Sequence, residues 1–175
     1  MNNMATFFKQ EKTKEEINWD AVYQEMLPRV YNFFRYRIGD DALAEDLTSA
    51  TFEKAWSARN DFRGELGAVS TWIFAIARNV KIDHFRKAKP QVELDVLESV
   101  ADDFLIEEQS QKRDESRALG ALLEELNPRD RELIALKYGA DMSNREIAKL
   151  TSLSESNVGT ILNRAVNKLR SAWEM

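Results

Sequence analysis

The chain has 175 residues, with no cysteine and a single histidine. This excludes disulfides, thiolate zinc sites and cysteine nucleophiles, and leaves almost no histidine for a metal or catalytic site. Hydrophobic residues at 43% and charged residues at 31% are typical of a soluble globular protein, and six Gly and three Pro suit an all-α fold. No apolar run approaches the roughly 18–20 residues of a membrane span, and residues 1–14 lack the hydrophobic segment of a signal peptide. We therefore expect a cytoplasmic protein with no membrane insertion, no metal and no cofactor.

The net charge of −5 is unevenly distributed. Residues 1–89 carry 14 basic and 13 acidic side chains, and residues 118–175 carry eight of each. Residues 90–117 carry three basic and nine acidic side chains, and they open with Pro90. This asymmetry predicts two small helical domains joined by a flexible acidic linker.

The chain begins with polar residues 1–16, which we expect to be frayed or disordered. From Ile17 onwards, apolar residues recur at the spacing of an amphipathic helix. Pro28 is expected to kink that helix or to divide it, and Gly39 is expected to end it.

A second helix is expected to start at a cap, Asp40 or Asp41, and to run to Trp56. Its outer face is acidic, which in isolation is most simply a solvated surface. Residues 57–67 form a loop with two glycines, two arginines and one aromatic residue. Trp56 and Trp72 are expected to be core residues.

A third helix is predicted from Ser70 to about Lys87, with apolar side chains on one side. The opposite side alternates aromatic and basic residues: Phe74, Arg78, Lys81 and Phe85. Such a stripe suits single-stranded or locally opened DNA, because cations follow the phosphates and aromatic faces stack on bases at roughly 1–3 kcal/mol each. The simpler alternative is that the aromatics pack on a second helix and the cations are solvated. His84, on the apolar side, is expected to be packed.

After the linker, leucines at helical spacing mark a helix that stops before Pro128. Asn127 as the N-cap and Pro128 at the first helical position predict the start of the next helix. Gly139 is expected to end it.

The segment 143–169 has the pattern of a helix-turn-helix. Ser143 and Glu146 have the spacing of a capping box, and Ser154 is the expected cap of the second helix. Such a helix lies in the DNA major groove with its N-terminal residues toward the base edges. Ser152 stands where the turn usually has glycine, so some strain is expected there. The outward side chains, most of which can hydrogen-bond to DNA, are Glu155, Ser156, Asn157, Gly159, Thr160, Asn163 and Arg164. A helical hairpin with a merely polar face is the alternative.

Several of these motifs, in this order, resemble bacterial RNA polymerase sigma factors of the sigma-70 class. The run from Asp41 to Trp56 is similar to the region-2 helix, and Phe62-Arg-Gly and the helix from Ser70 continue that region. The run from Leu126 to Gly139, with the helix-turn-helix, resembles region 4. Two regions with only a short linker match the extracytoplasmic-function (group 4) subgroup. The resemblance implies a region 2-like domain at 17–89, a linker at 90–117 and a region 4-like domain at 118–175.

The resemblance also implies a function in promoter recognition, DNA strand opening and transcription initiation. The expected partners are promoter DNA, core RNA polymerase (the clamp helices of its beta-prime subunit and the flap of its beta subunit) and an anti-sigma factor. The residues implied in polymerase docking are Asp41, Glu45, Asp46, Ser49 and Glu53. Ser49 departs from the glutamine usual in the family.

The minus-ten element would be bound by the loop and the third helix. The residues implied are Arg59, Asn60, Phe62, Arg63, Trp72, Asn79, Lys81, Arg86 and Lys87. Extruding a base costs a few kcal/mol, and a pocket lined by Phe62 and Trp72 would recover that cost.

The minus-thirty-five element would be read as duplex. The residues implied are Arg145, Ser154, Glu155, Ser156, Asn157, Gly159, Thr160, Asn163 and Arg164. Arg164 is the favoured base contact, because a bidentate arginine–guanine pair is the commonest specific one. Gly159 stands where relatives often carry a basic residue.

Two other readings remain open from the sequence. A stand-alone helix-turn-helix regulator would usually bind symmetric half-sites as a dimer, and a helical adaptor would bind only protein. An enzyme is not expected, since no nucleophile–base pair or metal cluster is evident.

The acidic linker would mimic the charge of the transcript. This hypothesis fails if reversing the charge of three acidic residues in the linker leaves the yields of abortive and full-length transcripts unchanged.

Overall fold

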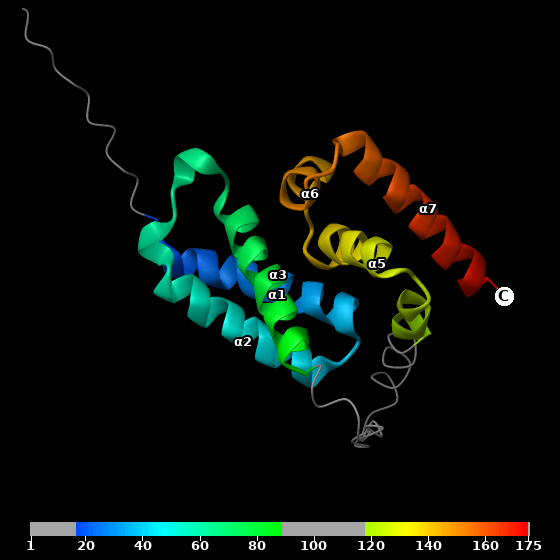
Figure 1. Cartoon of the computed structure of the whole chain (residues 1–175), viewed down its shortest axis with the longest axis horizontal. Coiled ribbons are helices and arrows are strands. Elements are labelled where there is room, and N and C mark those ends of the chain that lie inside the picture. The colour runs from blue at the N-terminus through cyan, green and yellow to red at the C-terminus, as the bar shows by residue number, and fades with distance from the viewer. Residues whose placement is uncertain (1–16, 89–117, 175) are drawn as a thin grey trace, which may run out of the picture.

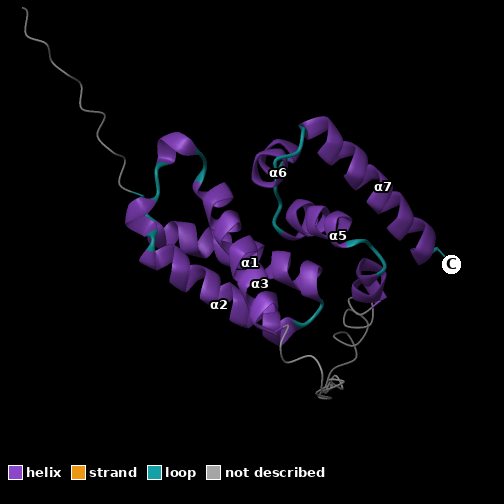
Figure 2. Cartoon of the chain, in the orientation of Figure 1, coloured by secondary structure: helices purple, strands orange, loops and turns teal. Residues whose placement is uncertain are grey.

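The computed structural model describes residues 17–88 and 118–174, and every regular element in these two ranges is helical (Figure 2). The expectations for residues 1–16 and for the linker at 90–117 lie outside the described residues. None of the described helices is long and apolar enough to cross a membrane. The elements are α1 (Trp19–Ile38), α2 (Asp41–Ser57), η1 (Arg59–Asp61), η2 (Gly64–Leu66), α3 (Val69–Ala88), α5 (Pro128–Ile134), η4 (Ala135–Gly139), α6 (Asn144–Thr151) and α7 (Glu155–Trp173). Residues 118–124 are helical as well.

From the sequence, Pro28 is expected to kink or to divide helix α1, and the division does not occur, because α1 is continuous through Pro28. A proline inside a helix costs roughly 3 kcal/mol, but α1 buries Met26, Val30, Phe33 and Phe34. Each of these side chains contributes roughly 1.5–3 kcal/mol on burial, so packing outweighs the proline. The helix ends as expected at Gly39, which has a left-handed φ of 81° and donates its N–H to the carbonyl of Arg35.

Helix α3 is buried on two sides, and for Phe74 this confirms the alternative in which an aromatic residue of the stripe packs on a neighbouring helix, here against Phe33 of α1. Its apolar side packs in the core through Ile73, Ala77 and Val80, each at most 4% exposed. On the opposite stripe, Phe74 is fully buried and Lys81 is only 7% exposed. The middle of α3 is therefore covered on both sides, while its last turns remain exposed.

The C-terminal elements begin at the expected caps. The side chains of Asn127, Ser143 and Ser154 accept hydrogen bonds from the first turns of α5, α6 and α7. At α6 both halves of the capping box with Glu146 are present. After α5, the chain continues as a π-helical turn, η4, up to Gly139.

The two helical halves share one hydrophobic core. Figure 1 shows α1, α2 and α3 grouped on one side and α5, α6 and α7 on the other. Contacts of α1 with η4 and of α3 with α6 join the groups. A Cβ atom on Gly139 would lie 2.8 Å from the carbonyl oxygen of Asn32. The backbones of α1 and η4 thus approach so closely that only glycine fits.

Candidate polymerase and nucleic-acid interfaces

Helix α2 presents one polar and one buried face. Leu47, Thr51 and Ala55 face the core, and the Thr51 hydroxyl donates to the carbonyl of Leu47 at 2.7 Å. The outer face holds the five residues implied in docking, all of them exposed: Asp41, Glu45, Asp46, Ser49 and Glu53. The result is an anionic strip along a rigid helix, with Asp41 also paired to Arg35 at 3.1 Å.

The loop after α2 is held by an aromatic cluster of Phe62, Trp72 and Trp19. The ring centroids of Phe62 and Trp72 are 5.3 Å apart, and Trp19 lies 6.2 Å from Phe62 and 6.0 Å from Trp72. Because Phe62 is only 8% exposed, the pair forms a packed cluster and does not line an open pocket in this structure. Sequence reasoning did not assign Trp19 to this site.

A separate apolar hollow of about 200 Å³ lies beside this cluster. Its lining residues are Trp19, Val22, Tyr23, Phe52, Ala55, Trp56 and Ile73. Trp56 is 55% exposed, so the expectation that it is a core residue is wrong. The Arg59 guanidinium lies 4.1 Å from the Trp56 ring centroid and donates to the Trp56 carbonyl at 2.6 Å. Of the other loop residues implied in DNA binding, Asn60 and Arg63 are exposed.

The α3 residues implied in DNA contact differ in their exposure to solvent. Asn79, Arg86 and Lys87 are exposed, and Arg86 pairs with Asp83 at 3.1 Å. Lys81 is buried and does not face solvent in this conformation. His84 is partly buried and packs edge-on against Phe85, as the sequence predicts.

Glu132 of α5 binds the cations that α3 turns toward the C-terminal half. Its Oε1 lies 2.6 Å from Arg78 Nε and 3.6 Å from Lys81 Nζ. Burial would raise the pKa of Glu132, but Lys81, Arg78 and Arg37 outweigh it and hold that pKa below its usual value. Burial lowers the pKa of Lys81, although Glu132 acts in the opposite direction. The sequence gives no signal for this cluster, because its members lie about 50 residues apart and meet only by packing.

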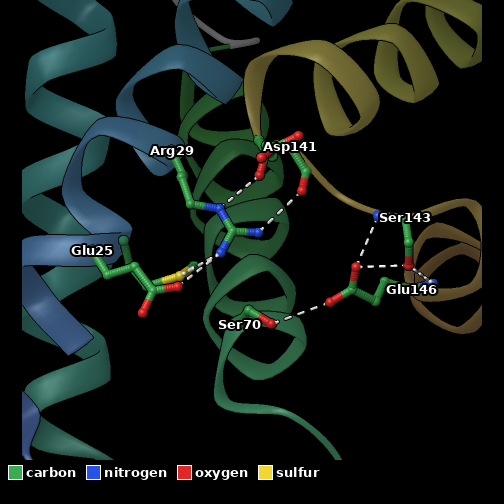
Figure 3. A network of polar contacts seen from close by, with 8 residues as sticks. Glu25, Arg29, Ser70, Asp141, Ser143 and Glu146 are labelled. Atoms are coloured by element: carbon green, nitrogen blue, oxygen red, sulfur yellow. Dashed lines mark hydrogen bonds and ion pairs between the residues drawn. The ribbon is translucent and has the colours of Figure 1, made fainter. Parts of the chain in front are cut away.

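A second polar network joins the halves further along the same interface (Figure 3). Arg29 donates from Nε to the carbonyl of Ala140 at 2.8 Å and from Nη2 to that of Asp141 at 3.4 Å. The Ser70 hydroxyl donates to Glu146, the capping-box residue of α6, at 3.5 Å. Arg29 thereby binds the carbonyls of the two residues that directly follow η4, where the chain leaves the helix.

The helix-turn-helix forms as its pattern predicts. Ile147, Val158 and Ile161 are buried between α6 and α7. Ser152 has a left-handed φ of 58°, so the strain expected at this non-glycine turn position is present. The implied contacts Arg145, Ser154, Glu155, Ser156, Asn157, Thr160, Asn163 and Arg164 are exposed, and Gly159 is partly buried.

Arg164 has a second role that its sequence position does not indicate. Its Nη2 donates to both carboxylate oxygens of Asp130, at 3.1 and 3.0 Å. Asp130 is 5% exposed and lies in α5. Arg164 therefore ties α7 to α5 in this structure, in addition to the base contact predicted for it.

Two family profiles match the two halves in order. Residues 22–91 match Sigma-70 region 2, and residues 116–169 match Sigma-70, region 4. The fold and its two matched regions define a sigma factor of the sigma-70 class, which directs transcription initiation.

The similar proteins narrow this class. The chain is 30% identical over 151 residues to the ECF RNA polymerase sigma factor BldN of Streptomyces coelicolor, covering 85% of this chain and 57% of BldN. It is 28% identical over 161 residues to the ECF RNA polymerase sigma factor SigM of Bacillus subtilis, covering 88% of this chain and 94% of SigM. The chain thus spans little more than half of BldN but nearly all of SigM. It belongs to the extracytoplasmic-function sigma factors, and the stand-alone regulator is not favoured.

Solved structures show the same fold. The sigma factor RpoE from Bartonella quintana, in complex with the anti-sigma factor NepR, matches with a TM-score of 0.69 at 21% identity, over 90% of this chain and 97% of RpoE. CnrH, in complex with the cytosolic domain of CnrY, matches with a TM-score of 0.61 at 23% identity, over 89% of this chain and 85% of CnrH.

Proposed function

We propose that this sigma factor works through three separate surfaces. The outer face of α2 docks on core RNA polymerase, the loop after α2 and helix α3 hold the opened minus-ten strand, and α7 reads the minus-thirty-five duplex. The observation that supports this division most directly is that most of the polar residues implied for each task are exposed on neighbouring elements, Lys81 being the exception. Such contacts need a cytoplasmic location, and none of them requires catalysis by the chain itself.

The docking surface is the anionic strip of α2, which would bind the clamp helices of the beta-prime subunit. Glu45 and Glu53 stand two helical turns apart on this strip and are both exposed. Reversing both charges should weaken association with core polymerase and leave the fold intact. The matched control reverses Glu125 and Glu174, which are exposed on the C-terminal half.

The minus-ten surface combines the exposed loop residues with the exposed end of α3. Arg63, Arg86 and Lys87 carry cations for the strand's phosphates. For the extruded base, the apolar hollow lined by Trp19, Tyr23 and Trp56 is a better candidate than the packed Phe62–Trp72 pair.

The minus-thirty-five surface is the N-terminal part of α7, where Ser156, Asn157 and Thr160 are exposed. Their side chains can donate to and accept from base edges in the major groove. Thr160 donates to the carbonyl of Ser156 at 3.0 Å in the free helix, a bond that base contact would replace. The beta-subunit flap would hold this half of the chain at the correct spacing.

The decisive experiment adds the purified chain to sigma-free core polymerase and maps the transcripts on genomic DNA. New start sites with a shared pair of upstream elements are expected. Failure to associate with core polymerase, or initiation at no site, would overturn the proposal.

An anti-sigma factor is a further proposed partner. The related folds of RpoE and CnrH were solved with NepR and with part of CnrY. On this chain, Ile82 and Phe85 of α3 are 53% and 45% exposed, and they give a partner helix an apolar surface to cover. Purification from the native host should yield a small companion protein, and its absence under all growth conditions would count against such a partner.

A further inference from the structure

Three cationic side chains converge on one carboxylate where the two halves meet. Arg78 and Lys81 of α3 contact Glu132 of α5 at 2.6 and 3.6 Å. Arg37, near the end of α1, is close enough for its charge to lower the pKa of Glu132. The cluster thus gathers three basic side chains around one carboxylate, and Arg131 of α5 adds a further positive charge close to Arg37.

One carboxylate does not satisfy this cluster. The Nε of Arg37 is buried and has no hydrogen-bond partner. Lys81 is 7% exposed, and burial disfavours its charged form. Placing several cations together out of water is costly unless an anion with several acceptor oxygens binds them. A nucleic-acid phosphate is such an anion, and arginine binds it through paired hydrogen bonds.

The packing of the two halves covers most of the cluster: the side chains of Lys81, Glu132 and Arg78 are 9%, 17% and 27% exposed. Arg78 also donates from Nη1 to the carbonyl of Leu150 in α6, at 2.7 Å. At Gly139 the two halves also meet backbone to backbone, since a Cβ atom there would lie 2.8 Å from the carbonyl oxygen of Asn32. A DNA strand can reach Lys81 only if the halves separate.

We infer that Arg37, Arg78 and Lys81 form a phosphate-binding site for the promoter strand, and that Glu132 occupies this site in the free chain and so inhibits DNA binding. The inference rests on the proposed function, because it assigns the ligand to be promoter DNA. In the closed chain the three cations share the Glu132 carboxylate as their anion, and in the open chain they would be paired with a DNA phosphate. Because the cations have an anionic partner in both states, opening costs less when polymerase holds the halves apart.

Two variants test the inhibition by different routes. Glu132→Gln removes the competing charge, and Gly139→Ala forces the backbones apart without changing any charge. Glu125→Gln is the matched control, since it removes one exposed carboxylate of the same half. Binding of a fluorescein-labelled single-stranded oligonucleotide to the full-length free chain is measured by anisotropy.

Both variants should bind the oligonucleotide about tenfold more tightly than the wild type if the closed form is about 90% populated. The control should not change. Adding Lys81→Gln to the Gly139→Ala variant should abolish the gain. An unchanged affinity in Glu132→Gln, or a gain that survives the loss of Lys81, would overturn the inference.

Separation of the halves is measured independently. The chain contains no cysteine, so Ser57→Cys and Ser171→Cys, on exposed ends of α2 and α7, can carry a fluorescence energy-transfer pair. Transfer should fall in Glu132→Gln and Gly139→Ala, and it should stay constant in the control. Unchanged transfer in both variants would overturn the inference, and Glu132→Gln decides the matter alone if Gly139→Ala fails to fold.

The same proteins assayed with core polymerase separate this inference from the proposed function. If the wild type initiates transcription but neither variant changes free-chain binding or transfer, only the inhibitory contact is refuted. If the wild type never initiates, the proposed function fails, and a rise in oligonucleotide affinity would then describe a nucleic-acid site with some other role.

Discussion

Arg164 illustrates how one residue can serve both structure and recognition. Its guanidinium donates from Nη2 to Asp130, which leaves Nε and Nη1 outside this pair. An arginine held in this way by a buried carboxylate has fewer rotamers open to it before it meets a base. The bidentate guanine contact that the sequence predicts for Arg164 also needs Nη2, so this side chain has to release Asp130 before it binds a base in that way.

Arg164→Ala should lower the free energy of unfolding by about 1 kcal/mol, the low end of the roughly 1–3 kcal/mol range for a buried group left unpaired. The low end applies because the Arg164 side chain is 66% exposed while that of Asp130 is 7% exposed. Urea denaturation followed by circular dichroism measures the change. Asn163→Ala, on the same exposed face, should change stability by less than roughly 0.5 kcal/mol. Equal effects of the two substitutions would contradict a structural role for Arg164.

At the scale of the elements, the stability of a short helix depends on the hydrogen bonds that cap its ends. Helix α6 has only eight residues, too few to be stable without caps and packing. Its capping box connects Ser143 with Glu146, and Glu146 also accepts from Ser70 in α3. The start of the helix-turn-helix is thereby tied to the other half of the chain.

Ser143→Ala should destabilise the helix-turn-helix by about 1 kcal/mol, the usual cost of losing a serine N-cap. In the Ser143→Ala variant, amide hydrogen exchange should become faster in α6, relative to the wild type, than it does in α1 and α2. Ser171→Ala, at an exposed position of α7, is the control. Uniform protection in the variant would show that packing alone holds α6.

The ion pairs of α3 with α5 predict a pH dependence. The pKa of Glu132 is lowered in the closed chain by Lys81, Arg78 and Arg37, which outweigh the effect of burial. A carboxyl group with a lowered pKa stabilises the closed state fully above its ordinary pKa of 4.5, and this contribution is lost as the pH falls through the lower value.

The difference in unfolding free energy between the wild type and Glu132→Gln should therefore be constant above about pH 5 and shrink toward lower pH. Urea titrations at a series of pH values measure it. Glu125→Gln should show no such trend. A difference that grows on acidification would mean that Glu132 is not held ionised by its cationic neighbours.

At the scale of the whole molecule, the net charge of the two halves and their closed arrangement both weaken DNA binding by the free chain. The N-terminal segment 1–89 has a net charge of +1 and residues 118–175 have none. Affinity for DNA rises with each phosphate that a protein neutralises. Neither half has a large surplus of cations, and the closed arrangement buries Lys81 as well.

We therefore predict that the free chain has little affinity for promoter duplex at physiological salt and gains it only in complex with core polymerase. Anisotropy of a labelled promoter fragment, with and without core polymerase, measures this. Core polymerase without the chain serves as the control. Tight sequence-specific binding by the isolated chain would contradict the prediction.

The amino-acid sequence by itself determined the all-α class, the helix starts at Asn127, Ser143 and Ser154, and the sigma-70 family. The helix starts depend on local spacing, because caps and periodic apolar residues act within one or two helical turns, and the family follows from the order of several motifs along the chain. The exposed face of α2 could be predicted for the same reason. The pocket assigned to Phe62 and Trp72 and the core position of Trp56 could not, because burial depends on which other elements pack nearby.

Only the tertiary structure decided how the two halves meet. Pro28 stays within one helix because the burial of α1 side chains in the core outweighs the local cost of a proline inside a helix. Glu132 meets Arg78 and Lys81 because chain segments distant in sequence pack together, and Gly139 lets them pack at contact distance. No local pattern encodes such a contact, since its free energy comes from burial and charge pairing that exist only once the chain has folded.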